Sequence, residues 1–94
     1  MIKILKLITG EELIGDVTLG AEVTTIKQPC SLQLVPSGRG DSQPMMAMIP
    51  YAMYTEDHRI VVDNEHVIWL ETPVTEMYNQ YNQVFGSGIQ IAGL

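Results

Sequence analysis

Histidine and carboxylate side chains gather in one stretch in the second half of the chain and are the first candidates for chemistry. They are Asp57, His58, Asp63, Glu65 and His66. Imidazole nitrogens and carboxylate oxygens are ligands that zinc takes in proteins, at recurring spacings. The spacing here matches no standard metal motif, and acidic residues are common in turns between strands. We therefore predict no metal site and no cofactor.

The hydroxyl and thiol nucleophiles of the chain lack the surroundings that catalysis needs. No serine sits in a G-x-S-x-G nucleophile elbow; the serines are Ser31, Ser37, Ser42 and Ser87. Cys30 is predicted to face inward, where a thiol is structural. Gly38-Arg39-Gly40 precedes neither a lysine nor a helix, so it is not a phosphate-binding loop. These patterns predict no catalytic residue, and we expect that the protein is not an enzyme.

Composition narrows the classes of function further. The 94 residues carry a formal net charge of -6. An acidic domain repels a phosphate backbone at long range, which argues against double-stranded DNA as a partner. No apolar run is long enough to cross a membrane, and the first residues do not form a signal peptide. One cysteine, Cys30, permits no intrachain disulfide, so we expect a cytoplasmic protein.

Strands must position these groups, because most of the chain is patterned for β-structure. The predicted strands cover residues 2–9, 12–19, 23–35, 45–54, 59–62 and 66–70, with a short candidate at 89–91. A polar loop is predicted from Pro36 to Pro44. One helix is predicted over about residues 73–85, since Thr72 suits its N-cap, Pro73 its first turn and Gly86 its C-terminal cap. We expect a single domain over residues 1–94.

The second strand carries the clearest structural signal. Leu13, Gly15, Val17 and Leu19 share one face, and polar residues dominate the other. A glycine in the middle of an inward face is costly unless the strand bends or another backbone approaches closely. Small barrels place their curvature at such glycines. The alternation therefore predicts a small all-β fold with strongly bent antiparallel strands; an OB-type barrel is a weaker alternative.

Two segments resemble the motifs of the Sm-like (LSm/Hfq-type) proteins. L-K-L-I-T-G-E-E-L-I-G-D-V is similar to the start of the first Sm motif, with Gly10 and Gly15 at its two glycine positions. I-K-Q-P-C-S-L-Q-L is similar to the end of that motif, with Lys27 at the usual aspartate and Ser31 at the usual asparagine. The chain departs from the family by starting in a strand and placing its helix last.

A third segment, I-V-V-D-N-E-H-V-I-W-L, is similar to the second Sm motif. Asp63 and Asn64 occupy the usual Arg-Gly or Lys-His positions, and His66 occupies a frequent asparagine position. The resemblance covers roughly residues 3 to 71. The chain also resembles, in overall style, Sm-like proteins encoded by phages of marine cyanobacteria, in which case its compartment would be the host cytoplasm.

The resemblance implies a five-stranded Sm-like (SH3-like) barrel over about residues 2–71 with one C-terminal helix. It also implies a homo-oligomeric ring of roughly five to seven subunits that binds single-stranded, uridine-rich RNA at its pore. The RNA-binding residues would be Lys27, Gln28, Ser31, Asp63, Asn64 and His66. The acidic balance and the Asp63 substitution keep an alternative open, which is a ring without RNA recognition that acts as a protein-interaction or assembly module.

Methionines concentrate in the fourth predicted strand, which is apolar on both faces. Methionine adapts to irregular surfaces and is frequent at binding interfaces. We expect one face of this strand in the core and the other at a subunit contact, where exposed strand edges of neighbouring subunits pair. The predicted interface residues are Met45, Met46, Met48, Met53, Val67 and Trp69.

Overall fold

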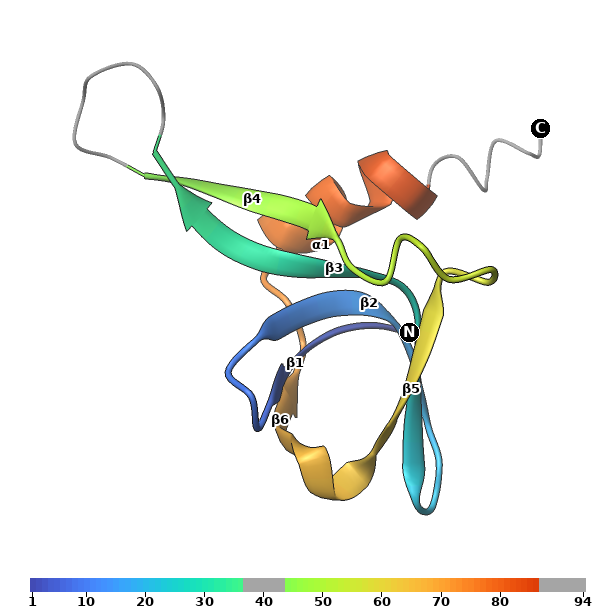
Figure 1. Cartoon of the computed structure of the whole chain (residues 1–94). Helices are drawn as coiled ribbons and strands as arrows, with labels where there is room; N and C mark the ends of the chain where they lie inside the picture. Colours follow the sequence, from blue (N-terminus) through green and yellow to red (C-terminus); the bar gives the residue numbers. More distant parts are fainter. Residues whose placement is uncertain (37–43, 87–94) are drawn as a thin grey trace.

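The computed structural model describes residues 1–36 and 44–86 of the chain. This part forms six strands, a short 3-10 helix and a C-terminal helix with a π-helical end (Figure 1). Their order is β1 (Ile2–Leu7), β2 (Glu12–Leu19), β3 (Val23–Val35), β4 (Met45–Pro50), β5 (Arg59–Asp63), η1 (Asn64–His66), β6 (Val67–Glu71), α1 (Thr75–Tyr81) and η2 (Asn82–Gly86). The predicted strand at 89–91 and most of the predicted loop at 36–44 lie outside the described residues.

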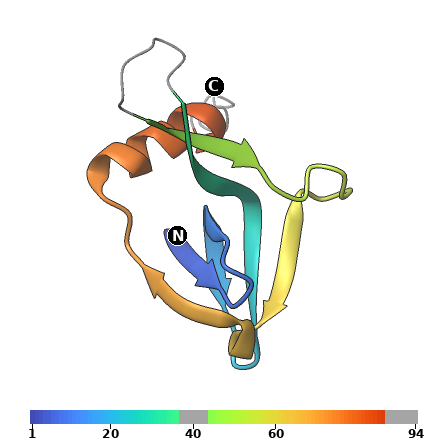
Figure 2. The same ribbon diagram turned by 60° about the vertical axis from the view of Figure 1, so that its left-hand side comes forward.

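All strand pairs are antiparallel and follow the order β4-β3-β2-β1-β6, while β5 pairs with β3 outside this path. The long strand β3 pairs with β2 along one edge and with two strands along the other: Val23–Lys27 pairs with β5, and Cys30–Val35 pairs with β4. Figure 2 shows β5 and β6 diverging from η1 on either side of the sheet. The mostly-β fold with a C-terminal helix is thus confirmed.

The structure describes six strands, at the places where the sequence pattern predicts six between residues 2 and 70, whereas the Sm-like resemblance implies five. The predicted strand over 45–54 ends at Pro50, and turn residues follow up to His58 before the chain pairs again with β3 as β5. Proline has no backbone N–H to donate to a ladder. β4 therefore ends earlier than predicted, and β5 follows as the separate strand that the sequence predicts over residues 59–62.

Two glycines shape the first hairpin. Gly10 has a φ of 104° in the turn between β1 and β2, where its N–H donates to the carbonyl of Leu7 at 2.9 Å. Gly15 lies in the middle of β2, directly under the bend of β3. A Cβ at Gly15 would lie 2.6 Å from Cγ2 of Ile26 and 3.0 Å from the carbonyl oxygen of Lys27. Of the two reasons expected for this glycine, a bend or a close approach of another backbone, the structure shows the close approach.

The core has two parts, one on each side of the sheet. The main core contains Leu5, Leu7, Leu13, Val17 and Ile26. The second cluster lies under the helix and is built around Ile14, Cys30 and Tyr81.

A β-bulge in β3 lets this one strand serve both parts of the core. Its residues 27 to 30 oppose residues 16 to 14 of β2, so β3 holds one extra residue at this point. Gln28, which has a φ of 50°, accommodates this extra residue. Because a bulge shifts the alternation of a strand, Ile26 faces the main core while Cys30 faces the helix.

The helix begins later than its sequence signals indicate. α1 starts at Thr75 with Val74 as its N-cap, and no side chain caps it. Thr72, the predicted cap, instead accepts a hydrogen bond from Nζ of Lys3 at 2.6 Å. Tyr81 is 2% exposed in the second cluster, where its ring packs 5.0 Å from that of Phe85. The helix therefore docks on its own sheet.

Candidate functional site

The first candidate surface consists of two strand edges. Within the described residues, β4 and β6 lie at opposite ends of the strand path and each pairs with one neighbour. The β3–β4 hairpin extends away from the other strands (Figure 1). Apolar side chains are exposed along both edge strands; they are Met45, Met46, Ile49, Ile68 and Trp69. In a single copy, these edges leave backbone groups and apolar area exposed to water.

The predicted interface residues fall into two groups, those that are exposed and those that pack against the rest of the fold. Met45, Met46 and Met53 are exposed, and Trp69 is 37% exposed. Met48 packs instead against the second cluster below the helix.

The expected division of β4 by alternate faces is not what the structure has. Met46 and Met48 share one face of this antiparallel strand, yet only Met48 is covered. The two residues in the middle of β4, Ala47 and Met48, are half-buried, whereas both ends of the strand are exposed. Val67, expected at the interface, is half-buried and packs against the main core opposite Leu7.

Three of the predicted RNA-binding residues gather at η1. The Asn64 side chain closes the turn between β2 and β3: its Nδ2 donates to the carbonyl oxygens of Gly20 at 3.0 Å and Ala21 at 3.3 Å. Its Oδ1 accepts from the hydroxyl of Thr24 at 2.6 Å. Asp63 and His66 on either side are exposed. The side-chain amide of Asn64 therefore stabilises the fold through these hydrogen bonds.

The other three, Lys27, Gln28 and Ser31, lie within β3 and not in a loop beside η1. Lys27 is exposed, whereas Ser31 is 7% exposed and accepts a hydrogen bond from Nε2 of Gln33 at 3.2 Å. The carbonyl oxygen of Gln28 accepts from the Tyr81 hydroxyl at 2.8 Å. The six predicted residues therefore form two separate groups.

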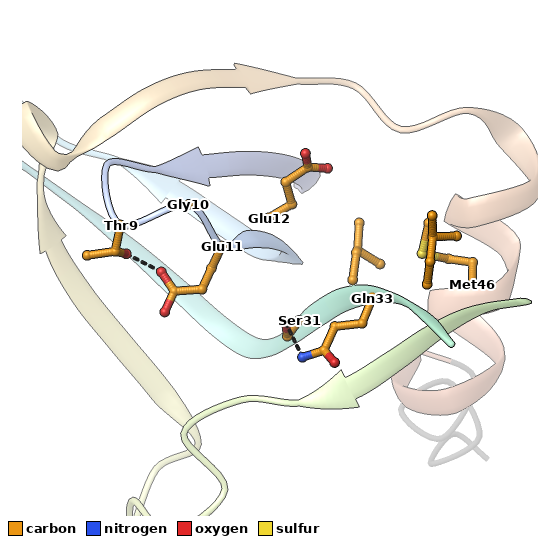
Figure 3. A pocket seen from close by; sticks show the side chains of 9 residues that line it. Thr9, Gly10, Glu11, Glu12, Ser31, Gln33 and Met46 are labelled. Carbon is orange, nitrogen blue, oxygen red and sulfur yellow. Dashed lines mark hydrogen bonds between the residues drawn. The ribbon is translucent and has the colours of Figure 1, made fainter. Parts of the chain in front are cut away.

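A hollow of about 590 Å³ opens beside the root of the β3–β4 hairpin (Figure 3). It is lined by Thr9, Gly10, Glu11, Glu12, Ser31, Leu32, Gln33, Leu34 and Met46. Tyr51 donates a hydrogen bond to the Glu11 carboxylate at 3.2 Å, and Thr9 donates another. The bond from Thr9 lowers the pKa of Glu11, so this carboxylate stays charged. This acidic hollow is unsuited to phosphate groups.

A smaller pocket of about 300 Å³ lies at the bulge of β3 and is called the bend pocket below. It is lined by Gln28, Pro29, Pro50, Tyr51, Met53, His58 and Phe85. Sequence reasoning identified only Gln28 as a candidate ligand contact among these residues. Two of its lining residues, Gln28 and His58, have positive φ angles, which glutamine does not signal in a sequence and histidine signals only weakly.

In the described part of the chain, no group of three histidine, cysteine or acidic residues is placed to hold a metal ion. None of the helices in residues 1–36 and 44–86 is both long and apolar enough to cross a membrane. No protein-family model matches the sequence, and no curated protein matches it.

Proposed function

We propose that this protein assembles, as Sm-like proteins do, into a closed homo-oligomeric ring in which the free edge of β4 pairs with the free edge of β6 of the next subunit. The observation that supports this proposal is that the two edges lie at opposite ends of one strand path and both expose apolar side chains. Pairing them satisfies backbone groups and buries Met45, Met46, Ile49 and Trp69 together.

The two edges differ, and this difference selects the symmetry of the assembly. A contact between unlike surfaces is head-to-tail, and it generates a ring when the rotation closes. We propose roughly five to seven subunits, each folded as an Sm-like barrel whose strand path is completed by its neighbour. Ile68 is one extra residue in β6 opposite Lys6 and Leu7. A bulge at that point restricts pairing to one register, which favours a discrete ring over open-ended aggregates.

We infer that the ring serves as a protein-interaction or assembly module. Three observations argue against a pore that binds bases. The net charge is -6, the carboxylate of Asp63 is exposed, and the side-chain amide of Asn64 already forms hydrogen bonds within the fold. Pore binding of single-stranded, uridine-rich RNA is the second candidate. Its favouring observation is that Lys27 and His66 are exposed, so that a ring would repeat them as circles of donors with high effective concentration.

Native mass spectrometry with and without oligouridine tests both candidates. We expect one discrete closed oligomer with no gain in mass, which supports the module. A gain of one oligouridine per ring, lost in Lys27→Glu while the ring persists, would support the pore-binding candidate instead. A monomer at all concentrations would refute the ring.

Edge variants test the contact itself. Met46→Asp and Ile68→Asp each place a carboxylate where the proposed contact buries apolar area, which is unfavourable without a partner. We expect both to run as monomers with unchanged circular dichroism. Val84→Asp is the matched control, because Val84 is 59% exposed on the helical segment and lies on no strand edge. A ring that persists in both edge variants would show that the β4–β6 contact is wrong.

A further inference from the structure

The acidic hollow beside the β3–β4 hairpin borders a stretch of strand edge that β2 leaves uncovered. The pairing of β2 with β3 reaches no further along β3 than Ser31, which lies opposite Leu13. β2 begins at Glu12, whereas β3 continues to Val35 and pairs over these last residues with β4. Among the described strands, none lies against the other edge of this part of β3. That free edge faces the hollow, which Gln33 and its neighbours line.

The alternation of an antiparallel ladder identifies the backbone groups that point to the hollow. The N–H of Tyr51 donates to the carbonyl oxygen of Pro29 at 2.8 Å, one step beyond the pairing of Cys30 with Pro50. The backbone groups of successive residues point alternately toward the partner strand and away from it. Every second residue after Pro29 therefore bonds to β4. Leu34 lies five positions after Pro29, so its N–H and C=O point to the free edge.

The charged groups around the hollow favour a cationic ligand. Its lining includes the carboxylates of Glu11 and Glu12 but no lysine, arginine or histidine (Figure 3). Glu12 lies 3.8 Å from Nζ of Lys6, and both side chains are partly exposed. Such a pair contributes little, so Glu12 can bind another cation. In the part of the chain that the structure describes, these carboxylates belong to no group of three metal-ligating residues, which favours an organic cation.

Exposed apolar side chains lie beside the free edge. Leu34 is 66% exposed, and Met46, directly opposite it on β4, is 39% exposed. Both line the hollow. Covering such area is favourable, and the aliphatic stems of lysine and arginine cover apolar surface while their charged ends stay polar. The hollow therefore offers a long basic side chain both an apolar wall and a carboxylate.

We propose that the acidic hollow binds an extended, basic segment of a partner protein. The segment adds a short strand to the free edge of β3 at Leu34 and places a lysine or arginine against Glu11 and Glu12. This inference names the partner of the interaction module and rests on that part of the proposed function. It does not need the ring, because the ring would use the outer edge of β4, on the other side of the same hairpin.

Fluorescence anisotropy with short labelled peptides at low ionic strength tests the proposal. The probe is an N-acetylated six-residue peptide of alternating arginine and valine, and its counterpart alternates glutamate and valine. Two further arginine–valine peptides carry N-methyl groups, one on all arginine amides and the other on all valine amides. Because successive N–H groups of a strand point to opposite edges, each methylated peptide lacks the donors of one edge only. An added strand presents one edge to β3, so only one of the two should bind.

Variants of the protein test its side of the contact. Glu12→Gln removes one carboxylate of the hollow. Leu34→Pro removes the N–H that points to the free edge and leaves the bonds between β3 and β4 in place, as proline does on edge strands; circular dichroism checks that the fold persists. Glu22→Gln is the matched control, because it removes the same charge between β2 and β3, outside the hollow. Ile68→Asp, the monomeric edge variant, separates this site from the ring.

We expect saturable binding of the arginine–valine peptide and none of its glutamate counterpart. Binding should weaken at least about fivefold in Glu12→Gln and in Leu34→Pro, the effect of losing one hydrogen bond of about 1 kcal/mol. Glu22→Gln and Ile68→Asp should bind as the wild type does. A monomeric wild type that binds the peptide would refute the ring and still support this site. No binding, equal weakening in Glu12→Gln and Glu22→Gln, or equal binding of the two methylated peptides would overturn the proposal.

Discussion

Gly15→Ala tests the close approach between β2 and β3. The added methyl carbon would lie 2.6 Å from Cγ2 of Ile26, 3.0 Å from the carbonyl oxygen of Lys27 and 3.3 Å from Cα of Pro29. Two of these three atoms belong to the backbone of the β3 bulge and cannot rotate away. Overpacking a core costs about 1–3 kcal/mol, and more where the neighbour is rigid, so we expect a loss of about 2–4 kcal/mol. The whole domain is worth about 5–14 kcal/mol.

Urea unfolding followed by the fluorescence of the single tryptophan, Trp69, measures this loss. With a slope of about 1–2 kcal/mol per molar urea, the midpoint should fall by roughly 1–4 M at fixed protein concentration. Ile26→Leu removes the Cγ2 atom of the shortest contact. The double variant should therefore recover about 1 kcal/mol relative to the sum of the single changes.

Gly10→Ala is the comparison, because no atom lies within 4 Å of its Cβ and only its φ of +104° opposes the change. It should cost about 1–2 kcal/mol from the backbone alone. A wild-type midpoint for Gly15→Ala, or strictly additive effects with Ile26→Leu, would refute the steric reasoning.

Two further predictions concern the thiol and the turn at η1. Burial raises the pKa of Cys30 from 9.0 to about 11. The folded state thus keeps this proton longer than the unfolded state. The raised pKa contributes about 2–3 kcal/mol to the free energy of unfolding below pH 9, and this contribution is lost as the pH rises to 11. The urea midpoint of Cys30→Ala should therefore fall less between pH 9 and 11 than that of the wild type. The same pH profile in both proteins would contradict this prediction. Asn64→Ala should lower stability by about 1–3 kcal/mol, because it leaves the buried Thr24 hydroxyl without its acceptor; the exposed His66→Ala should change it by less than about 0.5 kcal/mol, and equal effects in urea would show that Asn64 is not structural.

The strands were predictable because their signals are local. Alternation located β3 from Val23 to Val35 with the observed bounds, and Gly15 signalled either a bend or a close approach, of which the structure shows the close approach. The predicted strand over 45–54 was too long, because β4 ends at Pro50 and a turn follows it. The helix start was misplaced because Thr72 bonds to Lys3, a partner 69 residues away that no local pattern can indicate.

The candidate sites were predictable only in part, since they depend on how segments meet. The Sm-like resemblance groups Lys27 and Ser31 with Asn64, whereas the structure places the first two within β3 and Asn64 against Gly20 and Ala21. The bend pocket joins residues from β3, from the 51–58 segment and from the helical end. Its formation requires the bulge, which moves Cys30 and the helix to the side opposite Ile26.

The pairing of β1 with β6 sets the order in which this protein can fold during its synthesis. Ile4 lies opposite Glu71 and Leu5 opposite Leu70, so β1 waits for a partner strand that is synthesised much later in the chain. Until then, the unpaired edge of β1 and the apolar residues Leu5 and Leu7 of the main core lack their partners. At roughly 5–20 residues per second, the wait lasts several seconds. The nascent chain therefore passes through an aggregation-prone stage that chaperones bound at the ribosome would be able to shield.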